Sequence, residues 1–177
     1  MSCRDRNRPR TGNAFAFAVL LLCSSPSPVF GQTPLKLAGR RGTAIEGALT
    51  EAAQRAEARL ATPSCRMVFL DFRSLNGHLL QETLDGLGQN GQTYFRSLVF
   101  YDGYGRSACA PRDIIAFTSP GSRAIFVCSP QFVERVRREP GLAAALLIHE
   151  ELHALGLGEN PPSSKGITQK VIERCGK

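Results

Sequence analysis

The segment 147–156 constrains the fold more than any other part of the chain, because His149 and His153 stand four residues apart in it and Glu150 follows the first histidine. Residues four apart on an α-helix project from the same face, so two imidazoles can reach one metal ion from a single rigid helix. Apolar residues at 142, 145, 146 and 152 recur at the same spacing, and Pro140 suits a first helical turn. The sequence therefore predicts a helix from 140 that carries both histidines on or beside its inward face.

These three residues also indicate a chemistry. Zinc is the natural ion for two imidazoles at this spacing, and the neighbouring Glu150 carboxylate can take a proton from a water held by the metal instead of binding the ion itself. A histidine on an apolar helix face is more often a hydrogen-bonded core residue than a ligand. However, the chain has only three histidines, and two of them flank the required acid. We therefore expect His149 and His153 to bind Zn²⁺ and Glu150 to be catalytic.

A zinc site needs a third protein ligand, and Glu159 is the first candidate. Gly156 lies three residues after His153, and glycine tolerates the left-handed conformation that ends a helix and turns the chain back. A residue three further on can then approach the metal, and a glutamate oxygen is a competent zinc ligand. Glu173, within a later predicted helix, is the alternative third ligand. For both glutamates, a solvated carboxylate is the competing interpretation.

The pattern H-E-x-x-H-x-x-G-x-x-E resembles the metzincin branch of the zincin metallopeptidases, in which a third histidine or an aspartate takes the last position. The chain departs from metzincins in having Glu159 there. It also lacks the methionine turn of that family, because its only methionines are Met1 and Met67. Glu173 as third ligand looks more like the gluzincins, although the residues before it do not reproduce their N-E-x-x-x-D surroundings. Over the whole chain we recognise no particular family.

This resemblance implies a zincin-like fold of the α+β class. A small twisted sheet would pack on an N-terminal helix and on the helix with the two histidines, and a short C-terminal helix would follow. The hydrophobic pattern is compatible with that order. It predicts helices at 45–60, 79–87 and 164–174, and strands at 67–72, 94–101, 114–118 and 124–128.

Residues 1–31 read as a signal peptide and not as part of the fold. A basic start with four arginines precedes the apolar run 14–23, which is too short to span a bilayer, and a small, proline-broken stretch follows. Cys23 as a lipid anchor is disfavoured, because Leu22 is bulkier than such processing sites normally accept. The mature domain is predicted to span 32–177 as a single unit.

Removal of the signal takes away four arginines and one aspartate, so the formal charge falls from +7 to +4. The domain that remains is mildly basic, with neither a lysine-rich run nor an aromatic stripe. This composition argues against nucleic acid as a partner.

The four cysteines of the predicted mature domain indicate an oxidising compartment, so the protein is expected to be secreted or periplasmic. Three pairings are open. We favour Cys109 with Cys128, because they flank two strand-like runs joined by a turn, which leaves Cys65 for Cys175. A cysteine zinc site is disfavoured, because none of the four belongs to a C-x-x-C pair.

The sequence as a whole predicts an exported zinc metallopeptidase that hydrolyses a peptide or protein substrate. An extended substrate would pair with a sheet edge, at 124–128 or 114–118. The residue that stabilises the oxyanion is left open among four candidates: Tyr94, Tyr101, Tyr104 and His78.

Two other functions stay open at this point. One is an exported protein that binds metal without being an enzyme. The other is a zinc amidase that acts on a non-peptide amide, for example in cell-wall material. The carboxylate of Glu150 beside the histidines distinguishes an enzyme from a protein that only binds metal, because hydrolysis requires Glu150 and a purely structural metal site does not.

Overall fold

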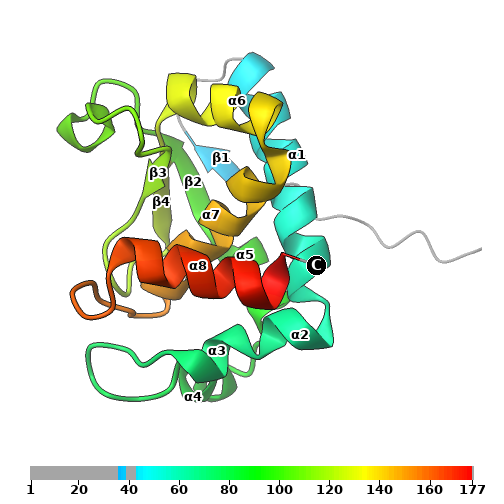
Figure 1. The fold of residues 1–177 in the computed structure, drawn as a ribbon, viewed down its shortest axis with the longest axis vertical. Coiled ribbons are helices and arrows are strands. Elements are labelled where there is room, and N and C mark those ends of the chain that lie inside the picture. Colours follow the sequence, from blue (N-terminus) through cyan, green and yellow to red (C-terminus); the bar gives the residue numbers. More distant parts are fainter. Residues whose placement is uncertain (1–35, 39–42, 177) are drawn as a thin grey trace, which may run out of the picture. The chain divides into compact units, whose positions relative to one another are not determined.

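A computed structural model describes residues 36–38 and 43–176 of the chain (Figure 1). All of them belong to the compact unit Thr33–Lys177. The predicted signal peptide 1–31 and its Cys23 lie outside the described residues. Among the residues described, no helix is both long and apolar enough to cross a membrane.

The described residues form an α+β fold, as the sequence predicts. Most of them are helical, and the strands are few and short. The helices are α1 (Thr43–Leu60), α2 (Pro63–Arg66), α3 (Val68–Asp71), α4 (Leu80–Gly86), α5 (Gly91–Ser97), α6 (Ser129–Arg138), α7 (Pro140–Ala154) and α8 (Ser164–Cys175), with a 3₁₀ turn at Ser107–Cys109.

The strands β1 (Lys36–Ala38), β2 (Val99–Asp102), β3 (Ala116–Phe117) and β4 (Ala124–Val127) form one mixed sheet in the order β1-β2-β4-β3. β1, β2 and β4 are parallel, whereas β3 runs antiparallel to β4 and is an edge strand. Phe100, Ile125 and Val127 point to the buried face. The 114–118 and 124–128 predictions are therefore confirmed in place, and β3 is shorter than expected.

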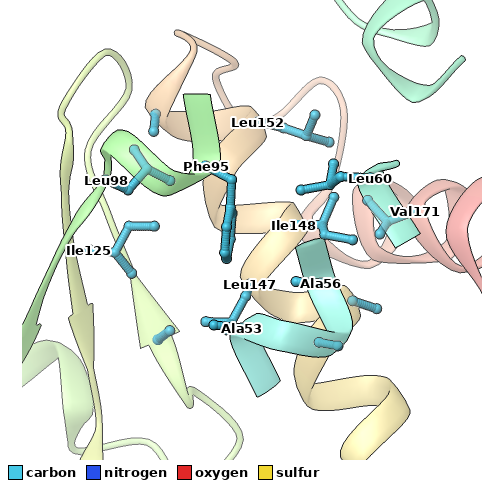
Figure 2. Packing of buried hydrophobic residues seen from close by; sticks show 14 of the residues in the cluster. Ala53, Ala56, Leu60, Phe95, Leu98, Ile125, Leu147, Ile148, Leu152 and Val171 are labelled. Atoms are coloured by element: carbon cyan, nitrogen blue, oxygen red, sulfur yellow. The ribbon is translucent and has the colours of Figure 1, made fainter. Parts of the chain in front are cut away.

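The helix α7 lies at the centre of the packing and contacts α1, α6, α8, β3 and β4. Ala53 and Ala56 of α1 face Leu147 and Ile148 of α7 in the close view of the core (Figure 2). Small alanine side chains let the two helix backbones approach closely, and burial of the larger partners stabilises the contact. This packing fixes α7, the helix that carries the histidines.

Two strand predictions are wrong. In the first run residues 68–71 form α3, and in the second run residues 94–97 belong to α5. Short apolar runs do not distinguish a buried strand from a buried helix turn. In α5 the local signal is a capping box, in which Asn90 and Thr93 bond each other's backbone amides, and this start favours a helix. Only the end of the predicted strand 94–101 is extended, as β2.

Both predicted disulfides are present, Cys65–Cys175 and Cys109–Cys128. The first joins α2 to the end of α8 across 110 residues of sequence. An Arg174–Asp71 ion pair and a hydrogen bond from Ser64 to the Arg174 carbonyl lie beside it. The C-terminal end of α8 is thus held against α2 and α3. Two disulfides are consistent with an extracellular location.

Candidate metal centre

The predicted helix forms as α7, and it brings His149 and His153 together on one face. Their rings meet edge to face with centroids 4.7 Å apart, and their Nε2 atoms are 2.9 Å apart. Both residues are buried, with exposed fractions of 3% and 6%. A position four residues on in a helix faces the same way, so this approach follows directly from the spacing in the sequence.

Glu159 reaches the same point through the turn that ends α7. Gly156 has a φ of 106°, a left-handed conformation that side chains rarely adopt, and its amide bonds the His153 carbonyl. Glu159 Oε1 lies 3.3 Å from His153 Nε2 and 3.8 Å from His149 Nε2. The three ligand atoms all lie within 4.8 Å of one another, so this group could hold a metal ion.

The alternative ligand Glu173 lies elsewhere. It is exposed on α8, where it pairs with Lys170 at 3.0 Å and accepts a hydrogen bond from Gln169. The Lys170 and Gln169 hydrogen bonds lower the pKa of Glu173. Among the described residues, the structure therefore places Glu159, and not Glu173, with the histidines.

Each histidine is oriented by a contact of its other ring nitrogen. His153 Nδ1 lies 2.8 Å from the Leu157 carbonyl oxygen, and His149 Nδ1 lies 2.9 Å from Thr168 Oγ1 on α8. A carbonyl only accepts, so His153 Nδ1 carries the proton and its Nε2 keeps a lone pair. Sequence reasoning missed both partners. The one available signal for Thr168 was a hydroxyl between the apolar positions 167 and 171 of the last helix.

His149 is also in the right charge state for a metal. Burial, with a smaller effect of the neighbouring His153, lowers the pKa of His149 to about 3. A neutral imidazole at neutral pH offers a free nitrogen lone pair, which a metal ligand requires.

Glu150 is the acid beside the histidines, and it is buried with an exposed fraction of 7%. Burial and the nearby Glu159 charge raise the pKa of Glu150 to about 8, against a smaller opposing effect of a hydrogen bond from the Thr118 backbone. Its Oε2 has no hydrogen-bond partner among the described residues. A buried carboxyl group with an unpaired oxygen and a shifted pKa is the kind of group that occurs at functional sites.

The next residue, Glu151, has a different environment. It is fully buried, neither of its carboxyl oxygens has a hydrogen-bond partner among the described residues, and burial raises its pKa well above the usual value. It does not line the cleft beside the histidines. Of the two adjacent glutamates, only Glu150 lines this cleft.

A cleft of about 620 Å³ opens beside the three ligand candidates. Its lining comes from β3 and the residues around it, from α7, from Glu159 and from Ser164 at the start of α8. The lining residues are Asp113, Ile114, Ile115, Ala116, Phe117, Thr118, Pro120, Leu146, His149, Glu150, His153, Glu159 and Ser164. The cleft therefore combines an apolar wall with the candidate metal centre.

The structure brings none of the four predicted oxyanion stabilisers to this cleft. Tyr94 is buried and donates its hydroxyl to the Ala154 carbonyl at 2.8 Å. Tyr101 stacks on Phe126, Tyr104 is exposed, and His78 pairs with Glu82. None of the four therefore lines this cleft, because their positions depend on tertiary packing that the sequence does not reveal.

No family model, curated protein or solved structure matches the chain significantly. The function of the cleft therefore has to be inferred from its own residues.

Proposed function

We propose that the protein is an exported zinc-dependent metallopeptidase, with His149, His153 and Glu159 as metal ligands and Glu150 as the catalytic residue. The observation that carries the proposal is the convergence of the three ligand atoms within 4.8 Å, beside a cleft that Glu150 also lines. Two neutral imidazoles and one carboxylate are a typical catalytic zinc set, in which one position stays open for water or substrate.

The proposed chemistry divides between the ion and Glu150. Zinc, when bound, lowers the pKa of a coordinated water to about 7 and polarises a carbonyl oxygen. Glu150 accepts the proton of the water that attacks the carbonyl carbon, in the carboxylate form that the positive charge of a bound ion would favour. As the carbon–nitrogen bond breaks, Glu150 donates that proton to the leaving amine. The Thr118 backbone hydrogen bond keeps the Glu150 carboxyl oriented toward the cleft.

The substrate is proposed to lie extended along β3. This strand pairs with β4 on one side only and forms part of the cleft wall on which the substrate would lie. A peptide can add to such an edge through backbone hydrogen bonds, while its side chains meet the apolar wall. The arrangement of a sheet edge over a helix with two histidines is zincin-like, and the proposal extends that likeness to the fold.

Export of the protein is part of the proposal. The sequence predicts a signal peptide at 1–31, and the two disulfides suit an oxidising compartment. A secreted or periplasmic location brings the enzyme to extracytoplasmic protein substrates.

The test compares the exported wild-type protein with Glu150→Gln on an unstructured protein substrate. Glutamine keeps the shape of the side chain and cannot take the proton, so hydrolysis should fall by roughly 10²- to 10⁴-fold while bound metal is unchanged. Glu173→Gln, an exposed carboxylate on α8, is the matched control and should keep full activity.

A wild-type protein that binds metal and cleaves no peptide would overturn the proposal. The same proteins should then be assayed on cell-wall amides, which separates an amidase from an exported protein that binds metal without catalysis.

A further inference from the structure

The two histidines differ in the group that contacts the Nδ1 atom of each ring. His153 is held by the carbonyl of Leu157, four residues later in its own chain segment. His149 is held by the hydroxyl of Thr168, which belongs to a different helix and lies nineteen residues away. His153 thus has its partner within the turn that follows its own helix. His149 depends on how α8 packs against α7.

We infer that Thr168 is a positioning residue that fixes the ring orientation and the tautomer of His149 for metal binding. The inference rests on the proposed zinc site. For Nε2 to bind the ion it must lack a proton, so Nδ1 carries the proton and donates it to Thr168 Oγ1 over 2.9 Å. Groups that accept this proton orient the ring and increase the basicity of the ligand nitrogen.

The hydroxyl is placed by the packing of α8. Val171 and Cys175 follow Thr168 at three and seven residues, so the three share one helix face, and both are buried. Ser163 caps the start of α8, where its hydroxyl accepts from the Gly166 amide. The disulfide to Cys65 fastens the other end. Thr168 therefore lies between two fixed ends, and α8 contacts α7 directly (Figure 1).

The burial of His149 increases the effect of its contact with Thr168 on the tautomer of the ring. His149 is nearly inaccessible to solvent and its contact with Thr168 is partly buried, so water has limited access to replace the hydroxyl as the acceptor of the Nδ1 proton. A buried donor without a partner is costly, and the ring would lose part of its preference for the tautomer that binds metal.

The test uses two substitutions in the exported protein, Thr168→Val and Thr168→Ser. Valine keeps the shape of threonine and removes the hydroxyl, whereas serine keeps the hydroxyl and removes the methyl group. Loss of a partner behind a ligand histidine typically costs 10- to 100-fold in metal affinity. We expect a zinc affinity about tenfold or more weaker for Thr168→Val, measured by competition with a chelator, and recovery to within a few-fold for Thr168→Ser.

A second measurement follows the tautomer itself. Long-range ¹H–¹⁵N NMR spectra of the zinc-loaded wild-type protein should show the His149 proton on Nδ1 and coordination through Nε2. This measurement needs no variant, so it still decides the matter if Thr168→Val fails to fold.

Three outcomes would overturn the inference. They are equal zinc affinity of Thr168→Val and wild type, equal loss in both Thr168 variants, and a wild-type spectrum with zinc on Nδ1 of His149. If wild-type protein binds zinc and cleaves peptides while one of these outcomes appears, only the role of Thr168 fails. If wild-type protein binds no zinc, the proposed function fails with it.

Discussion

The candidate metal centre has two parts that are built differently, the histidine pair of α7 and the loop that carries Glu159. The histidines are buried on a helix that contacts α1, α6, α8 and the strands β3 and β4, and a second contact holds each ring. The Glu159 side chain is 41% exposed, and its carboxylate lies against the two histidines. The helix offers a prearranged pair of candidate ligands, and the loop places a carboxylate beside them.

This difference predicts how the site responds to change. Prearranged ligands bind a metal without a further loss of conformational entropy, so their removal should weaken metal affinity most. A partly exposed carboxylate can be replaced by water at lower cost. The path of the loop is nonetheless restricted, because a Cβ at Gly158 would clash with the Leu75 side chain, and the Leu75 amide bonds the Gly156 carbonyl at 2.9 Å.

The largest effect on metal affinity is expected for His149→Ala and His153→Ala. Each removes one of the two prearranged ligands, so the loss of affinity should exceed the roughly 100-fold that a contact behind a ligand can cost. Chelator competition measures it. His78→Ala, the remaining histidine of the chain, is the control and should bind metal like wild type.

A smaller effect is expected for Glu159→Ala. Since Glu159 is partly exposed, water can take its place, and we expect a loss on the order of tenfold, or about 1.4 kcal/mol. Glu159→Asp should recover part of the affinity, and Glu173→Ala should change nothing. A loss as large as that of the histidine variants would show that the loop is as prearranged as the helix.

Removing each disulfide in turn tests whether zinc binding depends on the anchoring of α8. The Cys65→Ala/Cys175→Ala protein should lose about 4.7 kcal/mol of stability from its long loop, and about 3 kcal/mol is expected for the shorter Cys109–Cys128 loop. Only loss of the Cys65–Cys175 disulfide should also weaken zinc binding, by a few-fold, because this disulfide fastens the helix that carries Thr168. Denaturant unfolding and chelator competition measure the two effects. Equal zinc affinity in both proteins would contradict this link.

Glu150→Gln should have the smallest effect on metal affinity, because Glu150 is not a proposed ligand. Its effect should appear in the metal-stripped protein as a change in pH dependence. A pKa raised from 4.5 to about 8 means that the folded state favours the protonated acid. This stability is fully present below pH 4.5 and is lost as pH rises toward 8, with a slope of up to about 1.4 kcal/mol per pH unit.

Denaturant unfolding of the metal-stripped wild type and Glu150→Gln proteins from pH 4.5 to 8 tests the direction of this change in stability. The stability of wild type relative to Glu150→Gln should fall from pH 4.5 to 8. A difference that rises or stays level would show that the carboxyl is not held protonated by its burial.

The same comparison explains what the sequence could and could not predict. The helix, its histidine pair and the turn at Gly156 depend on local spacing, and the structure brings them together as expected. The pattern of the runs 67–72 and 94–101 predicts strands, because apolar residues over a short stretch fit both a strand and a buried helix turn. Thr168 was missed, because its contact with His149 depends on the packing of two helices and no local pattern records it.

The most direct test of the central claim is metal analysis of the exported wild-type protein, combined with X-ray absorption at the zinc edge. The account predicts one zinc per chain, held by two imidazole nitrogens and at least one oxygen, with the two nitrogens reduced to one in His153→Ala. A protein without bound metal, or with zinc whose nitrogen ligands are unchanged in that variant, would contradict it.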